Sequence, residues 1–198
     1  MAVAAGMAAS NKVVYASSFA MFAAGRAFEQ IRNSICYPNL NVKVCATHAG
    51  ITVGEDGASH QCIEDIALMR SIPNMKVIVP CDQYQAKAIV KAVADIDGPC
   101  YVRLGRGAVE DVYDENYKFE LGKGKILREG QKIALIATGM MVQEALKAAD
   151  ILAKEDISVT VVDMPCIKPI DEELIEKIAK SHELIITCEE HNVYGGLG

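Results

Sequence analysis

Two short apolar segments flank a longer amphipathic one in residues 75–104, MKVIVPCDQYQAKAIVKAVADIDGPCYVRL. The segments 75–79 and 100–104 are rich in apolar residues, which is typical of buried strands. Residues 83–94 between them have the pattern of a helix. Apolar strands that alternate with helices in this way predict a parallel sheet covered on both faces.

The same alternation extends in both directions from this segment. Upstream, strands are expected at 12–16 and 41–46, and helices at 20–34 and 59–71, with Ser59 as the N-cap of the second helix. Downstream, strands are expected at 132–137, 158–163 and 184–188, and helices at 142–154 and 171–181. The sequence therefore predicts an α/β fold with two consecutive open, mostly parallel-sheet domains, each of three layers.

The composition changes after Arg106. Only 7 of the first 60 residues are charged, against 27 of residues 111–198. We expect one domain at 1–106, a linker at 107–124 whose acidic part is solvated, and a second domain at 125–198.

Both ends of the sequence lack the usual signals of a complete domain. The chain opens on Ala-rich sequence with no capping residue before it, and it stops in the Gly-rich stretch 194–198. We therefore expect a piece of a longer protein, with the first domain lacking its N-terminal part and the second incomplete.

Overall composition narrows the class of protein. The 198 residues are 51% hydrophobic and 23% charged, which excludes collagen-like, disordered and disulfide-scaffold proteins. The net charge of −6 and the lack of a long basic run argue against nucleic acid as a partner. No apolar run approaches the ~18 residues of a membrane span, so no membrane partner is expected.

The seven cysteines contain no CxxC pair and no histidine at ligand spacing. Several lie within or beside apolar runs, where a free cysteine behaves as a small buried hydrophobe. An odd number also fits a reducing compartment. We expect reduced structural thiols, no metal site and a cytoplasmic location.

The densest group of polar residues is 47–61, THAGITVGEDGASHQ, which directly follows a predicted strand. Ligands in open α/β sheets bind just outside the carboxyl ends of strands, so a site is expected here. His48 and His60, with Asp56 between them, supply groups that move protons near neutral pH. The alternative is a polar loop whose histidines only satisfy backbone groups.

The order of residues in this loop resembles the signature of the pyrimidine-binding domain of transketolase, a thiamine-diphosphate enzyme. Residues 18–22, SFAMF, with Ile31-Arg32 resemble the aromatic segment of that domain, and 101–107, YVRLGRG, resembles its phosphate-contacting segment. Residues from about 125 onward resemble the C-terminal domain of the family. The resemblance covers essentially the whole chain and is closest to the separate C-terminal subunit of split transketolases.

The resemblance implies a role for each polar residue of the site. His60 corresponds to the catalytic histidine that handles protons on the sugar substrate, and His48 to the one that contacts its hydroxyls or phosphate. Asp56 corresponds to the carboxylate that binds a sugar hydroxyl, and Arg106 to the arginine that binds the sugar phosphate through its planar fork. Arg103 is the weaker candidate for the phosphate, and we expect it in a structural ion pair.

Phe19 and Phe22 are three residues apart at a predicted junction of strand and helix. Two such rings could stack on a flat heterocycle, and the resemblance implies that they hold the aminopyrimidine ring of the cofactor. Without the resemblance, simple core packing is an equally good explanation.

The resemblance also implies what this chain lacks. The glutamate that contacts the aminopyrimidine, and the motif that binds the diphosphate with Mg²⁺ or Ca²⁺, belong to an N-terminal domain or subunit; the Glu55-Asp56-Gly57 stretch is not that motif. This chain would contact only the pyrimidine end of thiamine diphosphate and would be inactive alone. It would pair with the N-terminal part in a homodimeric enzyme, which would belong to the pentose phosphate pathway in the cytoplasm. The complete enzyme would transfer a two-carbon ketol unit from a ketose phosphate to an aldose phosphate.

Three alternatives remain open. A 1-deoxy-xylulose-5-phosphate synthase shares the architecture, but usually has a basic residue in place of His48. The β subunit of 2-oxoacid dehydrogenases lacks the Thr47-His48 start of the loop. A subunit that only assembles with a partner is the third.

The stretch 189–192, EEHN, is expected at the surface or an interface, and His182 at a helix C-terminus.

Overall fold

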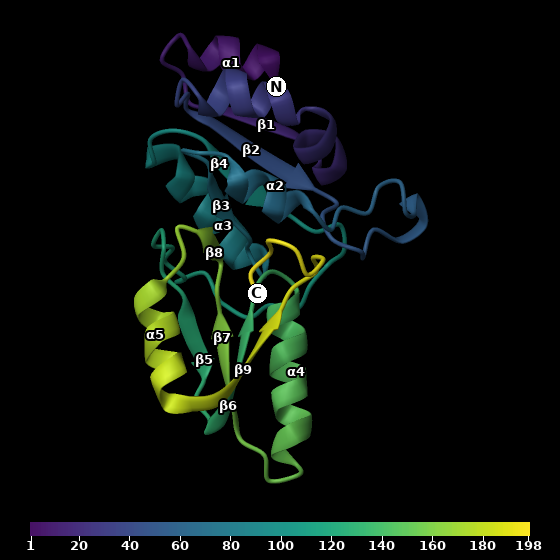
Figure 1. Ribbon diagram of the computed structural model, residues 1–198, viewed down its shortest axis with the longest axis vertical. Coiled ribbons are helices and arrows are strands. Elements are labelled where there is room, and N and C mark those ends of the chain that lie inside the picture. Colours follow the sequence, from purple (N-terminus) through teal and green to yellow (C-terminus); the bar gives the residue numbers. More distant parts are fainter.

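The computed structural model describes residues 1–198, which form two β-sheets flanked by helices (Figure 1). The first sheet has the order β1-β2-β4-β3-β8 and the second β5-β7-β6-β9. The strands of the first sheet are β1 (Val14–Phe19), β2 (Val42–Thr47), β3 (Lys76–Ile78), β4 (Cys100–Arg103) and β8 (Cys166–Lys168). Those of the second are β5 (Lys125–Arg128), β6 (Lys132–Ala137), β7 (Val159–Asp163) and β9 (His182–Cys188). All neighbours are parallel except the pairs β3–β8 and β5–β7, so the predicted α/β fold with two mostly parallel sheets is confirmed.

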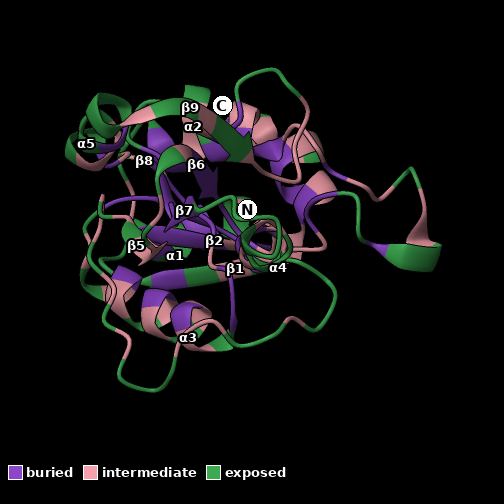
Figure 2. Ribbon diagram, turned by 90° about the horizontal axis from the view of Figure 1, so that it is seen from below, coloured by how far each residue is buried: buried purple, intermediate pink, exposed green.

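Helices cover both faces of each sheet. The α-helices are α1 (Ala2–Ala8), α2 (Asp65–Ser71), α3 (Gln83–Ala92), α4 (Met141–Ala153) and α5 (Glu172–Ser181), with π-helices η1 (Met21–Arg26) and η2 (Gln30–Cys36) and 3₁₀ turns η3 (Gly54–Asp56) and η4 (Val93–Asp95). In the first sheet, α1, η1, η2 and α2 pack on one face and α3 on the other. In the second, α4 and α5 pack on opposite faces (Figure 1). The inner strands β2, β4, β6 and β7 are largely buried, whereas the edge strands β1, β5 and β9 have half-buried or exposed residues (Figure 2).

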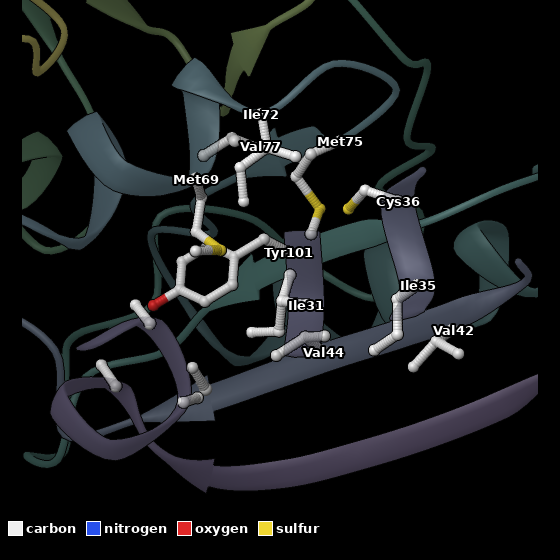
Figure 3. Close-up of a cluster of buried hydrophobic side chains, with 14 of the residues drawn as sticks. Ile31, Ile35, Cys36, Val42, Val44, Met69, Ile72, Met75, Val77 and Tyr101 are labelled. Carbon is white, nitrogen blue, oxygen red and sulfur yellow. The ribbon is translucent and has the colours of Figure 1, made fainter. Parts of the chain in front are cut away.

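The largest cluster of buried side chains lies between the first sheet and its helices (Figure 3). Ile31 and Ile35 of η2 pack there with Val44 of β2, all fully buried. Tyr101 of β4 is also fully buried, and its hydroxyl donates to Asp65 Oδ2 at 2.8 Å. A buried hydroxyl needs such a partner because its loss of water is otherwise uncompensated. This core fixes β1, β2 and β4 side by side, and their carboxyl ends carry the candidate site.

One expectation about a helix is wrong, and another holds only in part. The helix expected at 59–71 begins only at Asp65, and Ser59 is not its N-cap. Cys62 instead forms an antiparallel bridge with Gly50, which keeps the chain extended just ahead of the helix. The helix expected at 20–34 is divided into η1 and η2.

Two strands have no counterpart in the expected pattern, and one of them joins the two halves of the chain. β5 lies at the edge of the second sheet. β8 follows β7 in the chain but pairs with β3 of the first sheet.

The segment between the sheets was expected to be a linker with a solvated acidic part, and it is in addition anchored to both halves of the chain. Its charged residues are exposed, but Val112 and Tyr113 are half-buried and pack against the core of the second sheet. Asp82, ahead of α3, accepts hydrogen bonds from both of their backbone N–H groups, at 2.8 and 2.7 Å.

No helix combines the length and the apolar character that crossing a membrane requires.

Candidate functional site

The site begins where β1 and β2 end. Phe19 and Thr47, the last residues of these strands, are register partners, so the residue after Thr47 lies beside Phe19. That residue is His48, and its ring stacks on Phe19 with centroids 3.8 Å apart and planes 21° apart. The backbone of His48 has a φ of 59°, an uncommon conformation that directs the chain away from the strand. His48 Nδ1 lies 3.1 Å from the hydroxyl of Thr47.

Phe22 and His60 complete an aromatic cluster with Phe19 and His48. The rings of Phe19 and Phe22 are 6.2 Å apart and nearly parallel, at 16°. The imidazole of His60 meets both edge-on, 5.9 Å from Phe19 and 5.2 Å from Phe22. All four side chains are half-buried, so the cluster lies at the surface of the chain and is not part of the closed core. Its geometry suits a flat ring that stacks on one aromatic face.

Charged groups lie beside this cluster. His48 Nε2 is 4.0 Å from Asp56 Oδ2, and Arg106 Nε is 3.5 Å from the same oxygen. Arg106 Nη2 also bonds Glu55 Oε1 at 2.8 Å. The pKa of the exposed Glu55 is lowered by a hydrogen bond from its own backbone and by the nearby Arg106. The guanidinium is thus held beside the loop by two carboxylates that a stronger anionic ligand could displace.

The structure brings all six predicted site residues to one end of the first sheet. Phe19, Phe22, His48 and His60 form the aromatic cluster, and Asp56 and Arg106 lie beside His48. His60 Nδ1 lies 2.9 Å from the hydroxyl of its neighbour Ser59, which leaves Nε2 free of hydrogen bonds within the chain.

Arg103 has a different environment from Arg106. Its side chain is buried and forms an ion pair with the fully buried Asp65, with Nε 2.8 Å from Oδ2. The same guanidinium donates to the backbone oxygens of Cys62 and Glu190. The expectation that Arg103 makes a structural ion pair is therefore confirmed.

One contact to the loop was missed by sequence reasoning. Glu190, just after β9, accepts hydrogen bonds at Oε1 from the backbone N–H groups of Ile51 and Thr52 and from the Thr52 hydroxyl. The partners are more than 130 residues apart, and no local pattern signals such a pairing. The stretch 189–192 was expected at the surface or an interface, and it is half-buried against α2 and the residues before it: His191 Nε2 accepts from the N–H of Ala67, and the N–H of Asn192 donates to the backbone oxygen of Ile63. No group of three or more potential metal ligands is present.

A cavity of about 420 Å³ lies behind the loop, between the carboxyl ends of β3 and β4 and the start of α4. Asp82, Leu104, Met140 and Glu190 are among the residues that line it, and none of the six predicted site residues does. The aromatic cluster is therefore not part of this cavity.

Comparison with known proteins places this geometry in a family. Residues 1–111 match the model of the transketolase pyrimidine-binding domain, and residues 122–198 that of the transketolase C-terminal domain. A putative transketolase C-terminal section from Methanocaldococcus jannaschii is 55% identical over an alignment of 198 positions that covers 99% of this chain and 62% of that protein. A subunit of the apulose-4-phosphate transketolase of Phocaeicola vulgatus is 40% identical, and the match covers 99% of this chain and 63% of that subunit.

A solved structure agrees with these relatives. It is described as a split gene transketolase, in an inactive beta4 tetramer, and it matches with a TM-score of 0.92 at 54% identity over 98% of this chain and 63% of its own. The present chain thus spans less than two thirds of the length of these proteins. The two domain models and these relatives together show that the chain belongs to the transketolase family and carries its pyrimidine-binding and C-terminal domains.

Proposed function

We propose that this chain supplies one side of a transketolase active site, and that the complete assembly transfers a two-carbon ketol unit from a ketose phosphate to an aldose phosphate. The observation that carries the proposal is the convergence of two imidazoles, a carboxylate and a guanidinium around a pair of stacked phenylalanines. Sugar phosphates need this combination: hydrogen-bonding groups for hydroxyls, a cation for phosphate and a base for protons.

The aromatic cluster fits the pyrimidine end of thiamine diphosphate. Phe19 and Phe22 are half-buried and nearly parallel, so part of an aromatic face is accessible to a flat ring. When bound, the cofactor supplies the electron sink that a ketol transfer needs. Its diphosphate and the Mg²⁺ or Ca²⁺ are assigned to the N-terminal partner.

The polar residues have separate tasks in this proposal. Arg106 binds the sugar phosphate, and the exposed Glu55 leaves it when the phosphate arrives. Asp56 and His48 bind sugar hydroxyls or phosphate. His60 Nε2, which is free within the chain, accepts and returns a proton on the sugar, since a neutral imidazole can do both near pH 7.

We assign the rest of the enzyme to a partner. The proposal divides this chain into domains at 1–106 and 125–198, joined by 107–124, and pairs it with an N-terminal domain or subunit in a homodimer. Support comes from the relatives, which are described as a C-terminal section, one subunit of a transketolase and a split gene product. We further place the enzyme in the cytoplasm and in the pentose phosphate pathway; seven unpaired cysteines support a reducing compartment.

Reconstitution tests the proposal. The natural polypeptide is purified with and without its N-terminal partner, and ketol transfer between a ketose phosphate and an aldose phosphate is followed with thiamine diphosphate and Mg²⁺. We expect turnover only from the combined subunits, and none from this chain alone. A stable complex that binds thiamine diphosphate but transfers no ketol unit would show that the chain is only an assembly module.

A further inference from the structure

We propose that Glu190 is a positioning residue, through which the second sheet sets the conformation of the loop that carries His48, Asp56 and His60. The inference rests on the proposed function for its catalytic consequence, but its structural part stands independently. Glu190 lies two residues beyond β9, whose backbone pairs with β6 along its whole length. Its backbone therefore continues directly from the second sheet, whereas the loop belongs to the first.

Three hydrogen bonds join the carboxylate of Glu190 to the loop. Oε1 accepts from the N–H groups of Ile51 and Thr52, each at 3.2 Å, and from the Thr52 hydroxyl at 2.8 Å. The Thr52 hydroxyl also approaches the Met140 sulfur, at 3.3 Å. A hydroxyl has one proton to donate, and the charged, shorter acceptor is the stronger one. Both side chains that contact Thr52 thus come from the second half of the chain.

The loop is shaped to receive this carboxylate. Gly50 has a φ of 85°, and a Cβ on it would lie 2.7 Å from the Glu190 carboxyl group. Any other residue at position 50 would be strained at this φ and would push the Glu190 carboxylate aside. The backbone of Gly50 also bonds Cys62 in both directions, at 2.8 and 3.0 Å, which closes the base of the loop. The loop is therefore held at its base by Cys62 and at its side by Glu190.

Glu190 is itself held from behind. Arg103 donates to the backbone oxygen of Glu190 at 2.8 Å and to that of Cys62 at 3.3 Å, while its ion pair with Asp65 fixes the guanidinium. Arg103 thus sets the distance between Cys62, at the base of the loop, and Glu190, which holds the side of the loop. A shift of the second sheet would move Glu190 and, with it, Ile51 and Thr52, which lie three and four residues beyond His48.

This arrangement predicts a defect in substrate binding and not in cofactor binding. Phe19 and Phe22 belong to β1 and η1, and none of the hydrogen bonds of the Glu190 carboxylate is to these elements. Loss of the Glu190 carboxylate frees residues 51–57, beyond the Gly50–Cys62 bridge, and thereby disorders Asp56 and its neighbour His48. Misplaced substrate contacts of this kind lower catalytic efficiency even when the reacting groups are intact.

The test compares Glu190→Ala with Glu190→Gln and Glu189→Ala in the full-length polypeptide combined with its N-terminal partner. Glu189 is a matched control, because its carboxylate also accepts backbone N–H groups, those of Leu197 and Gly198, but does not touch the loop. We measure kcat and KM for ketol transfer, the affinity for thiamine diphosphate, and amide hydrogen exchange of residues 48–61.

We expect Glu190→Ala to lower kcat/KM about tenfold, mainly through a higher KM for the sugar phosphate, with unchanged cofactor affinity and faster exchange in the loop. Glu190→Gln keeps an acceptor oxygen and should restore most of both properties, and Glu189→Ala should resemble the wild type. Thr52→Val, at an exposed position, gives a milder version of the same effect if Glu190→Ala does not fold.

Equal loop exchange in Glu190→Ala and Glu189→Ala would overturn the inference, and so would faster exchange without any change in KM. A wild-type assembly that transfers no ketol unit defeats the proposed function instead. In that case the exchange comparison still decides whether Glu190 holds the loop.

Discussion

Arg103 and Arg106 show how two residues of one type, three positions apart, differ through their surroundings. Arg103 ends β4, and its side chain points into the protein, where Asp65 is fully buried beside it. Arg106 lies past the strand, about one third exposed, and contacts carboxylates at the surface. A buried ion pair is costly to break, whereas a surface pair contributes little to stability.

Substitution of each arginine by alanine should therefore separate stability from activity. Arg103→Ala leaves Asp65 unpaired in the core, and we expect it to lower the free energy of unfolding by about 3–5 kcal/mol. Arg106→Ala should change stability by less than about 1 kcal/mol. Its effect should be a loss of about tenfold or more in kcat/KM for phosphorylated sugars in the assembled enzyme.

Denaturant unfolding gives the first comparison, and kinetics with phosphorylated and unphosphorylated sugars give the second. If Arg106→Ala slowed both kinds of sugar equally, Arg106 would not be the phosphate contact.

The site residues that sequence reasoning located are those with a local signal. His48, Asp56 and His60 lie in one loop directly after a strand, and the ends of neighbouring parallel strands meet at one edge of a sheet. Glu190 has no such signal, because it meets the loop only after both sheets have formed. The same holds for Asp65, the partner of Arg103, since an acidic residue in the first turn of a helix is usually exposed.

At the scale of helices and strands, the length of an element decides whether the sequence predicts it. Long apolar strands such as β6 and β7 and helices such as α4 are clear from periodicity alone. β5 and β8 have four and three residues, too few for a periodic pattern, and β8 lies between Pro165 and Pro169, which usually argue against a strand. Their pairing depends on tertiary contacts that arise only when the sheets come together.

Asp82, which precedes α3, has two structural roles. One oxygen caps α3 by accepting from the N–H of Gln85 at 2.7 Å, and the other accepts from Val112 and Tyr113 in the segment between the sheets. We expect Asp82→Ala to lower the free energy of unfolding by about 2–4 kcal/mol, because a cap is lost and two partly buried donors lose their acceptor.

Asp82→Asn should have an intermediate effect, since its amide keeps one acceptor oxygen. Asp114→Ala is the control: it removes a similar contact, to the N–H of Asn116, at an exposed position, and should cost less than about 1 kcal/mol. Equal effects of Asp82→Ala and Asp114→Ala in denaturant unfolding would refute the double role.

At the scale of the whole molecule, a buried polar network connects the two sheets. Asp163, at the end of β7, accepts at Oδ2 from Gln85 of α3 at 2.6 Å and from the Tyr113 hydroxyl at 2.7 Å. Gln85 also bonds the hydroxyl of Tyr117. The other oxygen, Oδ1, is buried without a partner. The network thus contains residues from the first sheet's helix, the connecting segment and the second sheet, with an acidic group at its centre.

This network predicts how stability depends on pH. Burial is the main cause that raises the pKa of Asp163 from 3.8 to about 6, and the charge of Asp82 raises it further. The hydrogen bonds from Tyr113 and Gln85 and the charge of Lys125 act in the opposite direction and lower the pKa. The folded state therefore binds a proton more tightly than the unfolded state does. The stability that this tighter proton binding adds to the folded state is complete below about pH 4 and is lost as the pH rises through about 6.

Asp163→Asn keeps an acceptor for Gln85 and Tyr113 but carries no charge at any pH. Its free energy of unfolding should exceed that of the wild type above pH 7 by an amount on the order of 3 kcal/mol, and the difference should shrink as the pH falls from about 6 to 4. Denaturant unfolding of both proteins at a series of pH values measures this difference directly. A difference that stayed constant over this range would mean that Asp163 is ionised in the folded protein as readily as in the unfolded chain, and that the network between the sheets is held by a charged carboxylate.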